Sequence, residues 1–154
     1  GSMLSEELVS PQERSEGKIT ADQIFSLQRN FFSLQKVFNE TGAVHASAFY
    51  TSGGELISFA EDVGRHNAMD KCMGSALISG KRDEVFLIML SSRISFEMIR
   101  KGYRTGASVV AGVSAPTSGA VAIADEIDMT LIGFLRGERF NLYTHGERIS
   151  GIIS

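Results

Sequence analysis

Cysteine is nearly absent from this sequence, and long hydrophobic runs are missing altogether. The chain contains one cysteine, Cys72, which excludes an intrachain disulfide and a metal cage built from several thiolates. No apolar run approaches the roughly 18 residues that a membrane-spanning helix needs, so we expect no membrane association. No secretory signal pattern is present either, and we therefore expect a cytoplasmic protein.

Charge and composition indicate one globular domain that does not bind nucleic acid. The formal net charge is −3, whereas nucleic-acid-binding domains usually present a basic face. The length of 154 residues fits a single domain. Gly1 and Ser2 look like an expression scar, and the polar stretch that follows has no periodicity. We therefore predict a scar and disordered arm over 1–19 and a folded domain over 20–150.

Apolar periodicity predicts alternating helices and strands. A capping box formed by Thr20 and Gln23 opens the first helix, whose apolar residues recur at spacings of three and four. Continuous apolar runs such as 85–90 are typical of strands covered on both faces. The predicted helices are 20–38, 67–79, 95–103 and 117–126, and the predicted strands are 44–51, 55–59, 85–90, 108–113, 129–135 and 139–143. This alternation indicates a layered α/β domain with a mixed sheet.

Three polar loops, 61–67, 91–95 and 114–117, each leave the end of a predicted strand and open a predicted helix. In open α/β sheets, ligands bind in the crevice beyond the carboxyl ends of the strands, so we expect the three loops to share one mouth. Helix N-termini favour anions, and the guanidinium groups of Arg65 and Arg93 suit phosphate. The pattern predicts a pocket for a phosphorylated small molecule.

Many of the side chains in these loops are polar, and several of them also have a plain structural interpretation. Arg65 could pair with the acids before it, and His66 could cap its helix or pack in the core. Ser95 and Thr117 are suited to helix caps, and Glu97 is favoured in a first helical turn by the helix dipole. The candidate ligand-binding residues are Asp62, Gly64, Arg65, His66, Asn67, Ser91, Ser92, Arg93, Ser95, Glu97, Ser114, Ala115, Pro116 and Thr117.

The two other histidines and the cysteine are given structural roles. His45 lies inside a predicted strand with apolar neighbours, which favours a structural imidazole. His145, near the end of the chain, belongs to no motif and is predicted to be solvated. Cys72 lies on the apolar stripe of its helix, which favours a small buried side chain over a nucleophile.

The element order is also that of the cytidine-deaminase-like fold, so zinc chemistry has to be tested. A zinc deaminase needs a His or Cys ligand, a Glu two residues later, and two cysteines on the next helix. His66 opens the appropriate helix, but Ala68 stands where that Glu is required, and the next helix begins without cysteine. We therefore predict a three-layer cytidine-deaminase-like fold with a mixed central sheet and no zinc site, with nucleoside or base deamination as a remote alternative.

Four segments together resemble the formate dehydrogenase accessory proteins, the sulfurtransferases that serve the molybdenum cofactor. The segments are Thr41-Gly-Ala-Val-His-Ala46, Glu61-Asp-Val-Gly-Arg-His-Asn-Ala-Met-Asp-Lys71, Ser91-Ser-Arg-Ile-Ser-Phe-Glu97 and Ser114-Ala-Pro-Thr117. The resemblance runs from about Gln35 to Tyr143, and the string after Glu61 is long and specific.

The resemblance implies a deaminase-like domain without zinc in a cytoplasmic homodimer. It also implies that sulfur passes from a cysteine desulfurase to a molybdenum bis-guanine-dinucleotide cofactor, for use by the formate dehydrogenase catalytic subunit. From their positions and residue types, we expect Arg65 and Arg93 to hold phosphates, and Asp62 or Glu97 to accept hydrogen bonds from guanine. The hydroxyls of Ser92, Ser114 and Thr117 would orient the ligand, and His66 would stabilise negative charge near the sulfur acceptor.

The chain departs from the family in one respect, because it lacks the Cys-x-x-Cys pair of the family's mobile loop. A sulfur carrier needs a thiolate to attack the donor persulfide, so we expect no catalytic residue within this chain. We expect the C-terminal portion of a longer sulfurtransferase, and whether this chain alone is an enzyme stays open. The alternative is a non-catalytic docking module for the dehydrogenase or the desulfurase.

Overall fold

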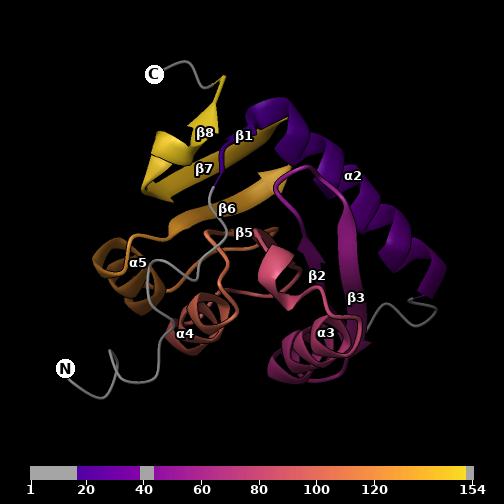
Figure 1. Ribbon diagram of the computed structural model, residues 1–154. Helices are drawn as coiled ribbons and strands as arrows, with labels where there is room; N and C mark the ends of the chain where they lie inside the picture. Colours follow the sequence, from indigo (N-terminus) through magenta and orange to yellow (C-terminus); the bar gives the residue numbers. More distant parts are fainter. Residues whose placement is uncertain (1–16, 39–43, 152–154) are drawn as a thin grey trace.

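A mixed sheet of six strands forms the middle layer of the computed structural model, which describes residues 17–38 and 44–151 (Figure 1). The strand order is β3-β2-β4-β5-β6-β7. Neighbours β4, β5 and β6 are parallel, while β2 is antiparallel to β3 and β4, and β7 is antiparallel to β6. The strands are β2 (His45–Tyr50), β3 (Leu56–Asp62), β4 (Leu87–Leu90), β5 (Val109–Gly112), β6 (Thr130–Arg136) and β7 (Arg139–Thr144).

Helices cover both faces of this sheet and complete three layers (Figure 1). Helix α2 (Ala21–Phe38) packs on one face, where Ile24, Leu27 and Phe31 join buried residues of the strands. Three helices pack on the other face around a second buried cluster. They are α3 (Arg65–Ile78), α4 (Phe96–Arg104) and α5 (Ser118–Glu126). The layered α/β fold with a mixed sheet is therefore confirmed, while its likeness to deaminases stays a prediction.

Local sequence signals account for the starts of α2, α4 and α5. In the predicted capping box, the Thr20 N–H donates to Gln23 Oε1 at 2.8 Å, and the Gln23 N–H donates to Thr20 Oγ1 at 3.0 Å. Ser95 caps α4 and Thr117 caps α5, each by accepting a backbone N–H three residues later. None of the described helices has an apolar stretch long enough to cross a membrane.

Two boundaries differ from the prediction next to the first polar loop. Strand β3 continues to Asp62, which pairs with His45 of β2, and helix α3 already begins at Arg65. The predicted loop over 61–67 is therefore reduced to Val63 and Gly64. The pairing with β2 is a tertiary contact between strands, so the apolar pattern alone, which ends at 59, did not reveal it.

A small parallel pair joins the two ends of the described chain, and the sequence patterns missed it. Strand β1 (Ile19–Thr20) pairs with β8 (Ile149–Ser150), and the short 3-10 helices Arg82–Glu84 and Gly146–Arg148 complete the elements. Ile19, which the prediction assigned to the arm, is 1% exposed. Residues 1–16, with the predicted scar and most of the arm, and residues 41–43 of the first motif segment lie outside the described residues.

Candidate functional site at the carboxyl edge of the sheet

The three predicted loops leave the same edge of the sheet. Because β2 is antiparallel to both of its neighbours, β3 runs in the same direction as β4 and β5. The carboxyl ends of β3, β4 and β5 therefore share one edge, and each strand is followed there by the start of α3, α4 or α5. We call this region the carboxyl edge. Its position agrees with the predicted mouth, although ligand binding there stays a prediction.

Backbone hydrogen bonds join the loops after β4 and β5 into one wall of the carboxyl edge. The Ile94 N–H donates to Ala115 O at 3.1 Å, and the Thr117 N–H donates to Ile94 O at 2.9 Å. Ile94 and Pro116 form a parallel bridge. Gly112 allows this approach, since a Cβ there would lie 2.6 Å from Ile94 Cδ1. The two loops are thus held by their backbones, independently of any ligand.

The second loop of that wall is also tied to β6. The Phe134 N–H donates to Ser114 O at 3.1 Å. A Cβ on Gly133 would lie 2.8 Å from Pro116 Cδ and 3.3 Å from Ser114 O, so this glycine lets β6 pass close to the loop. Ser114, Ala115 and Pro116 are consequently positioned by main-chain contacts.

Asp62 organises the turn between β3 and α3. Its Oδ1 accepts from the Gly64 N–H at 2.9 Å and from Asn67 Nδ2 at 3.4 Å, while its Oδ2 lies 2.7 Å from Lys71 Nζ. The bond from Lys71 and then the Gly64 N–H lower the pKa of Asp62 to about 2. Asp62, Gly64 and Asn67 therefore make one turn, and both carboxylate oxygens already have protein partners.

The surroundings of His66, in the first turn of α3, lower the pKa of its imidazole. Partial burial is the largest cause that lowers the pKa of His66, followed by the charges of Lys101 and Arg65, whereas Asp70 and Glu97 raise it. These influences come from α4 as well as α3, and the two helices are also linked by an ion pair between Lys101 and Asp70 at 3.1 Å. The His66 imidazole is therefore neutral near pH 7 and has one donor and one acceptor nitrogen.

Three hydroxyl groups of the wall accept structural hydrogen bonds and still keep a proton to donate, those of Ser91, Ser95 and Thr117. Ser95 Oγ and Thr117 Oγ1 accept backbone N–H groups of their own helices, at 3.3 and 3.1 Å. Ser91 Oγ accepts the Ala46 N–H at 2.8 Å. A hydroxyl that accepts one bond can still donate one. The predicted capping roles are therefore confirmed, and they do not exclude ligand contacts. Ser92 is nearly buried, and its Oγ donates to Arg93 O at 3.1 Å.

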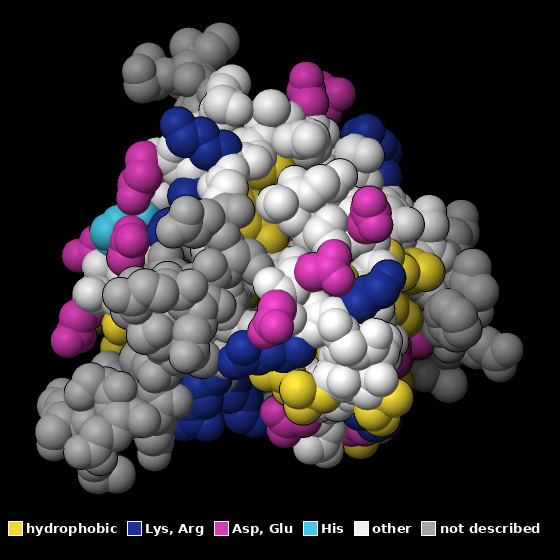
Figure 2. Space-filling view, in the orientation of Figure 1, with side chains coloured by type: hydrophobic (Ala, Val, Ile, Leu, Met, Phe, Trp, Pro, Cys, Tyr) yellow, Lys and Arg dark blue, Asp and Glu magenta, His cyan; other side chains and the backbone are white. Residues whose placement is uncertain are grey.

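Two guanidinium groups at the carboxyl edge are without a partner among the described residues, those of Arg65 and Arg93. Both residues are exposed. Arg65 does not pair with Asp62, which is engaged by Lys71 instead. Glu97 pairs with Arg100 at 3.3 Å, and its own side chain is 56% exposed. Figure 2 shows further basic side chains gathered over α4, whose sequence carries Arg100, Lys101 and Arg104.

Cys72 is buried away from the carboxyl edge, as predicted. Its Sγ donates to Ser47 O at 3.0 Å, and burial raises the pKa of its thiol to about 11. Very little thiolate exists at neutral pH, so Cys72 is unsuited to carrying sulfur.

His145 is not simply solvated, which corrects the prediction. Its Nε2 lies 2.7 Å from Asp125 O, and its Nδ1 lies 3.1 Å from Asp128 Oδ1 and 3.3 Å from Glu147 Oε1. The bond to the Asp125 carbonyl is the largest cause that raises the pKa of His145, and the nearby acids add to it. Among the described residues, Asp128, His145 and Glu147 have ligand atoms close enough for a metal ion, and the His145 ring already contacts both of these acids.

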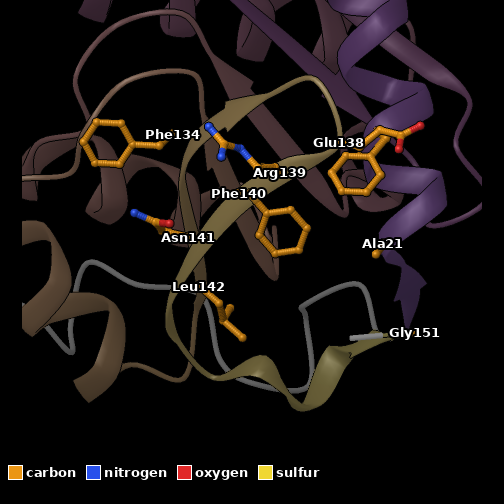
Figure 3. Close-up of a pocket in the computed structure, with 9 residues that line it drawn as sticks. Ala21, Phe134, Glu138, Arg139, Phe140, Asn141, Leu142 and Gly151 are labelled. Carbon is orange, nitrogen blue, oxygen red and sulfur yellow. The ribbon is translucent and has the colours of Figure 1, made fainter. Parts of the chain in front are cut away.

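Two hollows of the described surface are lined by residues other than those of the wall. One of about 770 Å³ is bounded by α2, Gly151 and the β6–β7 hairpin (Figure 3), where Phe25 and Phe140 pack with ring centroids 5.6 Å apart. A smaller one of about 180 Å³ lies between α3 and α4. The sequence motifs did not reveal either hollow, because their linings come from segments far apart in the chain.

Comparisons with known proteins identify a family to which this sequence is similar. The sequence profile of the FdhD/NarQ family matches residues 2–150. The sulfur carrier protein FdhD from Sulfurisphaera tokodaii is 47% identical over 133 residues, which cover 86% of this chain and 52% of that protein. The protein of the same name from Streptomyces avermitilis is 44% identical over 134 residues, which cover 86% of this chain and 48% of that protein.

A crystal structure shares the fold. A protein from Desulfotalea psychrophila, assigned as a formate dehydrogenase accessory protein, superposes with a TM-score of 0.82 at 27% identity. The alignment covers 97% of this chain and 62% of that one. The chain thus spans about half the length of the curated relatives it matches.

Proposed function

This chain belongs to the FdhD/NarQ family, and we propose that it binds the molybdenum bis-guanine-dinucleotide cofactor at the carboxyl edge and supports its sulfuration for formate dehydrogenase maturation. The observation that carries this proposal is the meeting of three helix starts with two guanidinium groups that lack a partner among the described residues. Relatives named sulfur carrier protein FdhD, and the neighbour assigned as a formate dehydrogenase accessory protein, support it.

Several side chains of the carboxyl edge have a direct chemical role toward the ligand in this proposal. Arg65 and Arg93 hold the phosphates, assisted by N–H groups at the helix starts. Ser92, Ser114 and Thr117 orient the ligand. A neutral His66 donates a hydrogen bond toward the negative charge of the sulfur acceptor without adding a cation.

Guanine recognition falls to Glu97 rather than Asp62. The Asp62 oxygens are occupied by Lys71, Gly64 and Asn67, so a guanine N–H would have to displace bonds that hold the turn. Glu97 has one ion pair, and its side chain is more than half exposed. Its carboxylate can accept the guanine N1 and N2 donors, while Asp62 positions the turn beneath the ligand.

Sulfur itself reaches the cofactor from a cysteine desulfurase in this proposal, through a thiolate other than that of Cys72. The attacking group must be a thiolate, and the Cys72 thiol is buried with a pKa of about 11. The chain therefore contributes the binding surface. We place it in a cytoplasmic homodimer that delivers the sulfurated cofactor to the formate dehydrogenase catalytic subunit.

The first experiment is a calorimetric titration with GDP of the wild type and of the Arg65→Ala and Arg93→Ala variants. Loss of one charged contact should weaken binding by about 1.5–3 kcal/mol, roughly 10- to 100-fold in Kd. The control is Lys81→Ala, since Lys81 is an exposed cation after the C-terminal end of α3. Unchanged affinity in both arginine variants would refute the phosphate roles, and equal weakening in Lys81→Ala would reduce the effect to net charge.

A non-catalytic docking module is the second candidate, and exposed apolar residues favour it. Ile78 is 91% exposed, Val63 is 80% exposed and Leu77 is 59% exposed, and Figure 2 shows hydrophobic side chains on the surface over α3. Docking on the dehydrogenase or the desulfurase would bury them. Binding of each purified partner should then weaken in Ile78→Asp and stay unchanged in Arg93→Ala, whereas the reverse pattern would remove this candidate.

A further inference from the structure

His45 lies at the carboxyl edge, between the strands whose loops form the proposed site. It is the first residue of β2 and pairs directly with Asp62 at the end of β3. On its other side, the Ala46 N–H donates to Ser91 Oγ at 2.8 Å, and the Ser91 N–H donates to Ala46 O at 3.1 Å. Continued by one residue, this antiparallel register places His45 beside Ser92. The residue predicted to be structural therefore stands between two of the three loops.

Alternation along β2 places the imidazole on the face that α3 and α4 cover. Phe49 belongs to the buried cluster on that face, whereas Ala46 and Ala48 belong to the cluster under α2. Successive side chains of a strand point to opposite faces, so His45 shares the face of Phe49. The imidazole is thus on the same side of the sheet as His66.

The first turn of α3 is the part of that helix nearest to His45. Cys72 Sγ donates to Ser47 O, which fixes the position of the helix along β2. Two residues along a strand span about 6.6 Å, and about four residues of a helix span the same length. Moving that far toward the start of α3 leads from Cys72 to Ala68. Ala68 has only a methyl group, so its side chain offers the imidazole no hydrogen bond.

The imidazole has no partner among the described residues. His45 is half-buried, and a partly buried polar ring normally bonds to protein, to water or to a ligand. Asp62, its cross-strand neighbour, is already bonded to Lys71, Gly64 and Asn67. A donor at this position therefore points to an acceptor that the described residues do not supply.

We propose that His45 is a further ligand-contacting residue of this site, whose ring N–H donates a hydrogen bond to a phosphate oxygen of a nucleoside diphosphate. An anionic acceptor fits because Arg65 and Arg93 make the carboxyl edge attractive to anions. This inference rests on the proposed function and assigns to it a residue that the loops themselves do not contain.

The test compares GDP and inorganic diphosphate binding by the wild type, His45→Ala, His45→Asn and Lys81→Ala, with thermal unfolding to verify that each variant folds. His45→Ala should weaken both ligands about tenfold, as expected for a hydrogen bond to a charged group. His45→Asn keeps an N–H donor and should recover part of that loss. Lys81→Ala should bind both ligands like the wild type.

The outcomes separate this inference from the proposed function. No binding of GDP by the wild type overturns the proposed function and this inference with it. Weakened binding in Arg93→Ala together with unchanged binding in His45→Ala overturns the His45 assignment alone. If His45→Ala does not fold, imidazole NMR of the wild type decides. The His45 ring signals should shift on GDP addition and saturate with the calorimetric Kd, and a response confined to His66 would contradict the proposal.

Discussion

The folded protein shifts the pKa values of two imidazoles in opposite directions from their ordinary value. The contrast shows which charges surround each of them. At the carboxyl edge, burial and the cations Lys101 and Arg65 lower the pKa of His66. In the turn after β7, the Asp125 carbonyl and nearby acids raise the pKa of His145. Cations therefore dominate the surroundings of His66, whereas carboxylates and a carbonyl surround His145. This difference is the reason for proposing an anion site at the carboxyl edge and a structural role for His145.

The largest expected effect comes from breaking the wall of the carboxyl edge at Gly112. In Gly112→Ala the new Cβ would lie 2.6 Å from Ile94 Cδ1, so the protein should lose about 1–3 kcal/mol of unfolding free energy through overpacking. Urea denaturation measures this loss, and GDP titration should show weaker binding.

The matched control for that substitution is Gly74→Ala, in the interior of α3. Apart from its chain neighbours and the backbone of its own helix, no atom lies within 4 Å of a Cβ built there, and alanine is the better helix former by about 0.5–1 kcal/mol. Stabilisation of Gly74→Ala beside destabilisation of Gly112→Ala is the expected pattern. Equal changes in the two variants would contradict the importance of the approach between Gly112 and Ile94.

A smaller effect is expected at the helix cap of the same wall. Thr117→Ala removes the acceptor for the Ala120 N–H and should lower the unfolding free energy by about 1 kcal/mol. Thr117→Ser keeps the acceptor and should stay close to the wild type in the same urea titration. A Ser variant as unstable as the Ala variant would show that the methyl group, and not the cap, matters here.

The two imidazoles should give opposite pH dependence of stability. The raised pKa of His145 means that its stabilising contribution is present below its unfolded value, about 6.5, and is lost as the pH rises through the folded pKa. The lowered pKa of His66 means that its contribution is present above about 6.5 and is lost as the pH falls toward the folded pKa. Chemical denaturation between about pH 5 and pH 9 measures both.

The stability advantage of the wild type over His145→Gln should therefore shrink as the pH rises, and its advantage over His66→Gln should shrink as the pH falls. The same direction of change in both variants would contradict the electrostatic contrast between the two regions.

The smallest effect concerns Cys72. Because burial raises the pKa of the thiol to about 11, iodoacetamide should leave the native protein almost unmodified at neutral pH, while the urea-unfolded chain should react fully. Mass spectrometry measures the labelled fraction. Rapid native labelling would show that the thiol is accessible and would reopen a sulfur-carrying role for it.

Short-range sequence signals predicted a large part of this fold. The capping box of Thr20 and Gln23, the caps Ser95 and Thr117, and the continuous apolar strands were identified from spacing and residue type, and the structure confirms them. Each depends on groups three or four positions apart, or on the burial of one continuous segment. The family was also identified from motifs, and the comparisons confirm it.

Signals that depend on distant segments were missed or misassigned. The pairing of Ile19 with Ile149 joins the two ends of the described chain, and no local pattern indicates it. The extension of β3 to Asp62 depends on its pairing with β2. The prediction of a structural role for His45 rested on its apolar neighbours in sequence; its neighbours in space are Asp62 and the loop after β4, and that role stays a prediction. Its place in the first motif segment was the one available signal.

The sequence by itself determined the helices, most of the strands, the family and the polar composition of the three loops, because hydrogen-bonding partners and apolar periods a few residues apart encode these features. Only the tertiary structure decided that Asp62 is bound within its turn, and that His45 stands at the carboxyl edge without a partner among the described residues. Those properties depend on which strands lie side by side and which helices cover them, and burial and charge at a side chain are set by that packing.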